Sequence, residues 1–213
     1  MEENSEMKKG VILLLIGVIL LSFAGCGLPI DIDSLSISKN SQYVLEPKTC
    51  KTLIGGTPAE AETVLANSHW VEGHFQSAVE DEEGNLVLTL SKKDKEHWEN
   101  HINQVINNRI ELDAADGYKF IVGDDYKSIE THTTKEVYLA DGYNIMRISL
   151  FCGIMQMLNG EDINNWYIDI KMVDLETGAL IKEVRFPENN LNVTDEDWER
   201  ALNGAEDDFA TVK

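Results

Sequence analysis

The sequence predicts an α+β fold in which three hairpin-helix units form one antiparallel sheet of about six strands, with the helices packed on one face. Two observations support this prediction. Paired strand patterns open near Trp70, Tyr118 and Trp166, so each hairpin begins 48 residues after the previous one. Each pair is followed by a helix-start signal or by an apolar run long enough for a helix. The repeat lies in hydropathy and element order and is not visible in the residue identities.

The first unit begins after the chain break at Gly55-Gly56. The stretch TPAE, from Thr57 to Glu60, is a capping box with proline at the first helical position, and it predicts a short helix through Asn67. The stretches WVEGHFQSAV and LVLTL then predict two strands joined by the turn EDEEGN.

A long helix is expected after this hairpin. Ser91 and Asp94 have capping-box spacing, and a helix of about 20 residues should begin there. Arg109 lies in the apolar stripe of this helix, so either its stem lies along the core with the guanidinium reaching outward, or it pairs with a buried acid. The apolar members of the stripe are Trp98, Ile102, Val105, Ile106 and Leu112.

The second and third units repeat the order of elements. DGYKFIVGDDYKSIETH predicts strand, turn and strand, and DGYNIMRISLFCGIMQMLNG predicts a helix, apolar nearly all round, that ends at Asn159-Gly160. A helix of that kind is expected at the centre of the domain. NWYIDIKMV and ALIKEVRF then predict strands around the turn DLETG, ended by Pro187. Thr194 and Gly204 bound a predicted short amphipathic helix, and a short acidic C-terminal tail follows.

The N-terminal segment has the character of an export signal. Lys8 and Lys9 precede an apolar run of 16 residues, Gly10 to Gly25, which is shorter than the roughly 20 residues that a membrane-spanning helix needs. The run leads into FAGC, which resembles the bacterial lipobox, where two small residues precede a cysteine that is acylated and becomes the new N-terminus. The lipobox usually has leucine three residues before the cysteine, and this chain has Phe23 there.

This resemblance implies a bacterial lipoprotein whose Cys26 carries a diacylglycerol and an amide-linked acyl chain. Two or more acyl chains, at about 0.8 kcal/mol per buried methylene, would hold it on the cell membrane, facing the extracytoplasmic side. The alternative is an uncleaved anchor helix with an incidental cysteine, and the positive-inside rule gives the same orientation in that case. The expected organisation is a signal peptide at 1–25, a lipid anchor and tether at 26–56, and a single α+β domain at 57–213.

The charge of the chain limits its partners. Asp and Glu number 38 against 18 Lys and Arg, for a formal net charge of −20. Such a surface repels nucleic acid and anionic lipid, so no nucleic-acid partner is expected. Solubility explains the excess of acids more simply than a specific basic partner.

Cysteines and histidines are the remaining candidate site residues. Cys50 and Cys152 are a pair that an oxidising compartment could join, but Cys152 lies in an apolar run where cysteine behaves as a small buried hydrophobe, so two free thiols are favoured over a disulfide. His97 and His101 are four apart on the long helix, a spacing that can hold a metal, yet no third ligand is identifiable and a polar flank is the simpler interpretation. His74 lies in the first predicted strand, five residues after His69, so their rings would point to opposite faces.

The function predicted from these observations is a non-catalytic binding module at the cell envelope, with no cofactor. It would be held at the membrane by its lipid anchor and would bind a protein or another envelope component. No nucleophile elbow, phosphate-binding glycine loop or activated cysteine is recognisable in the sequence. The alternative is an envelope hydrolase or metal-dependent enzyme whose site is assembled from scattered residues, His97 and His101 among them.

Overall fold

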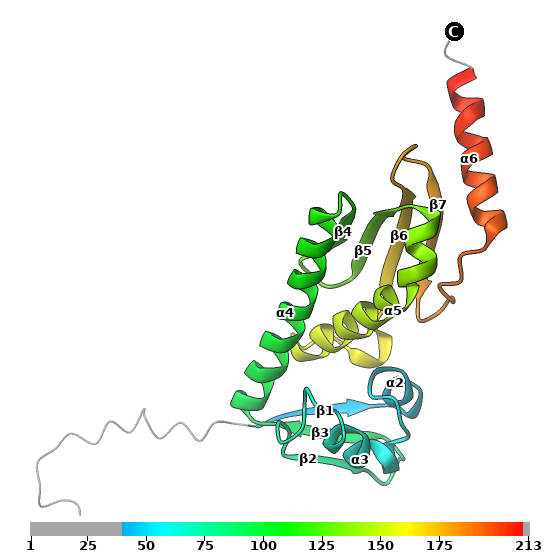
Figure 1. Ribbon diagram of the computed structural model, residues 1–213. Helices are drawn as coiled ribbons and strands as arrows, with labels where there is room; N and C mark the ends of the chain where they lie inside the picture. The colour runs from blue at the N-terminus through cyan, green and yellow to red at the C-terminus, as the bar shows by residue number, and fades with distance from the viewer. Residues whose placement is uncertain (1–39, 211–213) are drawn as a thin grey trace, which may run out of the picture. The chain divides into compact units, whose positions relative to one another are not determined.

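The structure is a computed structural model that describes residues 40–210, without the side chains of 139–143 and 204–210 (Figure 1). The predicted signal peptide, Cys26 and the first part of the tether lie outside the described residues. The described chain has an α+β fold with two sheets and helices between and beside them.

The first sheet has three antiparallel strands in the order β1-β3-β2: β1 (Ser41–Leu45), β2 (Ser77–Glu80) and β3 (Leu86–Leu90). Alternation along β3 buries Leu86, Leu88 and Leu90 completely. These three leucines form the part of the core that lies on this sheet.

The second sheet has the order β4-β5-β6-β7, with strands β4 (Lys119–Val122), β5 (Ser128–Thr133), β6 (Ile168–Asp174) and β7 (Leu180–Phe186). Its two hairpins are antiparallel, and β5 pairs with β6 in parallel. The residues of β5 alternate between the two faces of the sheet. Ile129 is buried in the core, whereas Glu130 lies on the other face, where its Oε2 is 3.4 Å from Nζ of Lys171 on β6.

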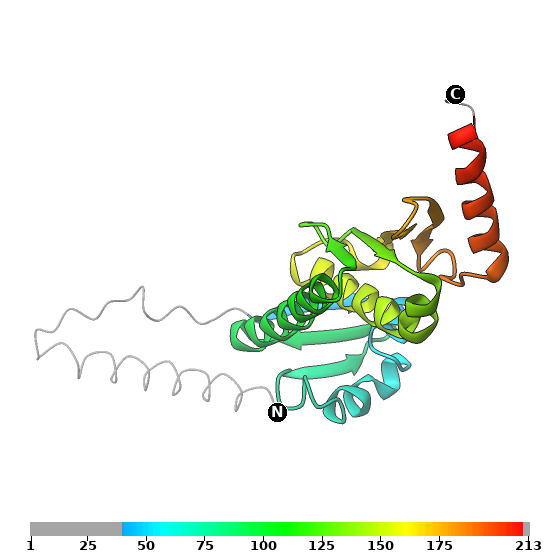
Figure 2. The ribbon, with the colours of Figure 1, turned by 45° about the horizontal axis from the view of Figure 1, so that its top comes forward.

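The helices connect these strands and cover them: α2 (Pro47–Leu53), α3 (Ala61–Ala66), α4 (Lys92–Ala115), α5 (Lys135–Leu158) and α6 (Asp195–Ala210), with short 3-10 turns η2 (Pro58–Glu60) and η3 (Ile163–Asn165). Helix α4 contacts β3 and then β4, and so joins the two sheets along its length. Helix α5 contacts α4, α2 and strands β5 and β6, and Figures 1 and 2 show it beside α4.

The prediction of a single six-stranded antiparallel sheet was wrong, although the α+β class is confirmed. A chain that leaves β5 through a long helix returns to the end at which β5 began, so the next strand pairs in parallel. Helix α5 is such a crossover. The first hairpin pairs instead with β1, from Ser41↔Leu90 to Leu45↔Leu86, and forms its own sheet.

The predicted tether was also wrong for its last residues, because 41–53 form β1 and α2. Leu45 and Cys50 are fully buried and belong to the core. Pro47 is in the first turn of α2, where its missing N–H is not needed. The helix is short and buries only Thr49, Cys50 and Leu53, so its apolar pattern is too brief to stand out in the sequence.

The long helix begins where the capping box predicts. The Asp94 N–H donates to Ser91 Oγ at 3.2 Å, and the Ser91 N–H donates to Asp94 Oδ2 at 2.9 Å. Nη2 of Arg109 lies 3.0 Å from Oδ1 of the largely buried Asp113. Of the two predicted placements, the structure therefore has the one in which Arg109 pairs with a buried acid. Leu112 was wrongly expected on the buried side of this helix, since it is 64% exposed although the next residue, Asp113, is buried.

Three further boundaries differ from the prediction. Helix α5 begins at Lys135, before the predicted start at Asp141. The strand expected over 70–79 is reduced to Ser77–Glu80, because the preceding residues form turns in which Gly73 has φ +73°. At the C-terminus, α6 continues through Gly204 to Ala210, so part of the predicted tail is helical.

Close packing on α5 requires a glycine at position 153. A Cβ at Gly153 would lie 2.6 Å from Cε3 of Trp166 and 2.8 Å from Cδ2 of Leu53. Both neighbours are buried, so the ring and the leucine have little room to move. Helix α5 therefore approaches α2 and η3 more closely than any side chain would allow.

We expect Gly153→Ala to lower the free energy of unfolding by up to about 2 kcal/mol, because overpacking costs about 1–3 kcal/mol and alanine regains about 1 kcal/mol of helix propensity. Urea unfolding of the two proteins measures the difference. Met146→Ala, at an exposed position of the same helix, is the control and should change stability by about 0.5 kcal/mol or less. An alanine variant more stable than the wild type would contradict the close contact.

Candidate binding cavity

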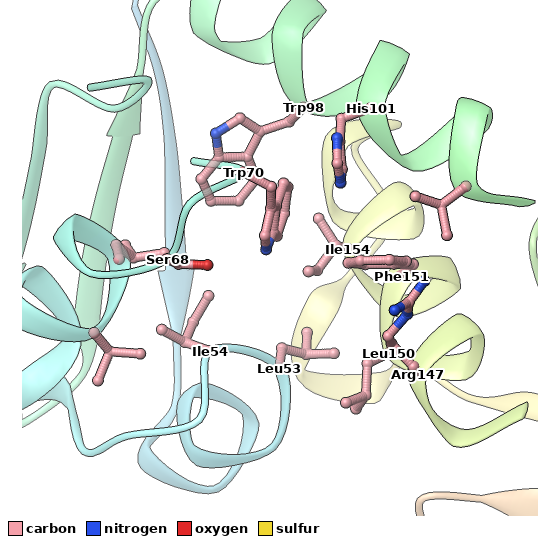
Figure 3. Close-up of a pocket in the computed structure, with 13 residues that line it drawn as sticks. Leu53, Ile54, Ser68, Trp70, Trp98, His101, Arg147, Leu150, Phe151 and Ile154 are labelled. Carbon is pink, nitrogen blue, oxygen red and sulfur yellow. The ribbon is translucent and has the colours of Figure 1, made fainter. Parts of the chain in front are cut away.

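A cavity of about 410 Å³ lies between the α2–α3 segment, α4 and α5 (Figure 3). Ten of its described wall residues are apolar or aromatic: Leu53, Ile54, Val64, Leu65, Trp70, Trp98, Val105, Leu150, Phe151 and Ile154. The polar wall residues are Ser68, His101 and Arg147.

Helical spacing brings the wall residues of α5 to one face. Arg147, Leu150, Phe151 and Ile154 stand at i, i+3, i+4 and i+7, the spacing of side chains that share a side of an α-helix. Trp98, His101 and Val105 do the same on α4. The remaining wall comes from the ends of α2 and α3 and the turns that follow α3.

Trp70 is the centre of an aromatic cluster that forms one wall. Its ring stacks on that of His101, with centroids 5.2 Å apart and planes at 16°. Trp98 and Phe151 meet Trp70 edge-on, at 5.2 and 5.4 Å. In Figure 3 the rings of Trp98, Trp70 and His101 lie on the α4 side of the cavity, and that of Phe151 lies on the α5 side.

Side-chain hydrogen bonds attach the turns around Trp70 to α4. His97 Nε2 lies 2.9 Å from the carbonyl oxygen of Trp70, and Trp98 Nε1 donates to the carbonyl oxygen of His74 at 2.8 Å. The rings of His74 and His97 stack with centroids 3.5 Å apart. The wall is therefore fixed by the protein itself, before any ligand is present.

The polar residues make one part of the wall electropositive. Burial lowers the pKa of His101, and the charges of His97 and Arg147 lower it further, so the His101 ring is uncharged at neutral pH. Arg147 keeps its charge, and its guanidinium carbon lies 5.9 Å from the ring centroid of Phe151.

A second, smaller hollow of about 190 Å³ lies along the same two helices. It shares Val105 and Arg147 with the larger cavity, and its other described wall residues are Asn108, Arg109, Leu112, Asn144 and Ile148. Four of the seven described wall residues of this hollow are polar or charged, against three of thirteen in the larger cavity, and Arg147 belongs to both walls.

The structure does not bring the predicted metal candidates together. His101 lies in the cavity wall, whereas His97 bonds to a backbone carbonyl and stacks on His74. Within the described residues, no group of three or more His, Cys, Asp or Glu is arranged to hold a metal ion. His69 and His74 do not share a strand, so the expectation of opposite strand faces was wrong.

Cys50 and Cys152 are both free and buried in the structure. The Cys50 thiol donates to the carbonyl oxygen of Gly56 at 3.3 Å. Burial raises the pKa of Cys50 to about 11 and that of Cys152 to about 12, so neither thiol is a ready nucleophile.

Sequence reasoning missed Trp70 and Arg147 as site residues. Arg147 is a cation within the apolar run of α5, and that position was the signal in the sequence that could have identified it. Trp70 carried no such signal, because it was assigned to the part of a predicted strand that forms turns in the structure.

No known protein family, curated protein or solved structure matches this chain. Among the described residues, no helix has the length and hydropathy needed to cross a membrane.

The lowered pKa of His101 can be measured by following its imidazole signals against pH by NMR. We expect a midpoint below the ordinary value of about 6.5, because burial and two nearby cationic groups oppose protonation. The unfolded chain binds this proton at higher pH than the folded chain, so His101 removes stability as the pH falls below about 6.5.

Arg147→Gln should raise the pKa of His101, since it removes one of the two neighbouring charges. Arg185→Gln is the matched control, because that arginine pairs with Asp169 on the second sheet and is not in the cavity wall. A His101 midpoint at or above its ordinary value in the wild type would overturn this description of the site.

Proposed function

We propose that this protein is a lipid-anchored binding module on the extracytoplasmic side of a bacterial membrane, and that it holds an apolar ligand in the cavity without chemical change. The observation that carries the proposal is the composition of the cavity wall, in which ten apolar or aromatic residues surround three polar ones. The location rests on the lipobox-like FAGC stretch that ends at Cys26.

The size of the cavity suits a small ligand. Binding cavities for small molecules span about 300–1,000 Å³ and are lined mainly by apolar and aromatic side chains with a few polar groups. The volume of about 410 Å³ falls in this range. Removing apolar surface from water is then the main source of affinity, at about 25 cal/mol per Å².

Preorganisation also favours binding. The aromatic cluster and the bonds from His97 and Trp98 hold the wall in place, so little ordering is left for a ligand to induce. A binding site that is already ordered loses less entropy when its ligand arrives.

A hydrolase is the second candidate, and it has one observation in its favour: Ser68 and His101 both line the cavity. A serine nucleophile needs a neighbouring base, usually oriented by a carboxylate. The described wall of the cavity contains no Asp or Glu, and the His101 ring packs against the rings of Trp70 and Phe151. We therefore place binding ahead of hydrolysis.

The anchor is tested by feeding cells a clickable fatty acid and isolating the protein. The wild type should be labelled and Cys26→Ala should not, because Cys26 is the proposed acylated residue. Cys50→Ala is the matched control and should be labelled like the wild type. Labelling that persists in Cys26→Ala would contradict the lipoprotein assignment.

Binding is tested with the full chain in lipid nanodiscs and the neutral fluorophore N-phenyl-1-naphthylamine, with empty nanodiscs as the blank. The wild type should bind the probe. Leu150→Trp should weaken binding about tenfold or more, because the larger side chain fills space that a ligand needs. Leu180→Trp makes the same change at an exposed site on β7 and should bind like the wild type.

Equal binding of the probe by Leu150→Trp and the wild type would contradict the proposal that the cavity is the binding site. Ester hydrolysis by the wild type that Ser68→Ala abolishes would favour the hydrolase instead.

A further inference from the structure

We infer that the cavity takes a single-chain amphiphile with one anionic head group, its alkyl chain between α2, α4 and α5 and its head at Arg147. This inference rests on the proposed function, because it assumes that the cavity is a binding site. It adds the chemical class of the ligand.

The position of Arg147 supports an amphiphile. This arginine is exposed to solvent and belongs to the walls of both hollows. On one side of it lies the larger cavity, and on the other a hollow whose wall includes Asn108 and Arg109. A ligand that reaches both hollows can bury an apolar part in the larger cavity and place a polar part beside Arg147.

The charge of Arg147 is available to a ligand. The chain has four arginines, all among the described residues, and three of them pair with carboxylates: Arg109, Arg185 and Arg200. Arg147 has no ion pair with any described residue, and its described partner is the ring of Phe151. A carboxylate or phosphate on a ligand would supply the bidentate partner that the other three arginines find within the chain.

The local charge differs from that of the whole chain. The formal net charge of −20 opposes the approach of anions. At the cavity, however, the described wall has no acid, and Arg147 is its charged residue. Near contact, this guanidinium outweighs distant charges that salt screens.

The aromatic rings point to an alkyl chain rather than a planar ligand. Trp70 contacts three other rings, those of His101, Trp98 and Phe151, so much of its ring surface is already covered. The opposite wall is aliphatic and includes Leu53, Ile54 and Val64. Branched aliphatic walls make contacts that do not depend on direction, which suits a flexible chain.

The test uses isothermal titration calorimetry to compare three probes that share a ten-carbon alkyl chain and differ in the head group: decanoate, decanol and decyltrimethylammonium. The full chain is held in lipid nanodiscs, and partition into empty nanodiscs is subtracted. Decanoate should bind about tenfold more tightly than decanol, since a charge-assisted contact with Arg147 adds to burial of the chain. Decyltrimethylammonium should bind more weakly than decanol.

Arg147→Gln should reduce decanoate affinity to that of decanol and leave decanol unchanged. Arg147→Lys should retain part of the preference for decanoate over decanol, because lysine keeps the positive charge but lacks the planar guanidinium that binds a carboxylate through two N–H groups. Arg185→Gln, which removes one positive charge away from the cavity, should leave all three affinities unchanged.

A series of straight-chain carboxylates, from octanoate upward, tests whether the cavity holds the alkyl chain of the ligand. Affinity should rise about fourfold for each added methylene and stop rising once the cavity is full.

The outcomes separate this inference from the proposed function. Failure of every probe to bind would overturn both. Equal binding of decanoate and decanol, with no effect of Arg147→Gln, would overturn the anionic head and leave the apolar binding module intact. Tighter binding of 2-naphthoate than of decanoate would overturn the inference that the apolar part of the ligand is an alkyl chain.

Discussion

From Ile148 to Leu158, almost every side chain of α5 is withdrawn from water, so this helix needs an apolar neighbour on each of its sides. Strands β5 and β6 supply one neighbour, α4 a second and α2 a third. Two polar side chains within the segment are satisfied: Ser149 donates to the carbonyl oxygen of Ile145, and Gln156 donates to the carbonyl oxygens of Tyr126 and Tyr167. The fold is therefore organised by the burial of one helix.

The cavity follows from the same constraint. Where Gly153 lies, α5 approaches α2 and η3 closely. On the face that carries Phe151 and Arg147, α5 and α4 are instead separated by the aromatic cluster and by open space. Close packing at one face and a preformed hollow at another thus belong to a single helix. The turns that carry Trp70 complete the wall because His97 and Trp98 bond to their carbonyls.

Local signals in the sequence predicted local structure well. The capping box at Ser91, the hairpins of the second sheet and the apolar character of α5 are all present. Strand partners that are distant in sequence were not predictable, because β1 finds β3 through long-range packing and the parallel pairing depends on where the crossover helix places the chain. The site was missed for a similar reason. Its wall comes from α2, α3, α4 and α5, and no single stretch of the sequence displays it.

Our proposal of a protein that holds a poorly soluble ligand near a membrane rests on the apolar walls, an arginine that has no ion pair with a described residue, and an export-like N-terminal sequence. The most direct measurement is the NMR shift of the four tryptophan indole N–H signals on addition of decanoate, since Trp70 and Trp98 line the cavity and Trp198 lies on α6. This account predicts the largest shifts at Trp70 and Trp98 and little change at Trp198. Unchanged signals for the two cavity tryptophans at saturating decanoate, or the largest shift at Trp198, would contradict it.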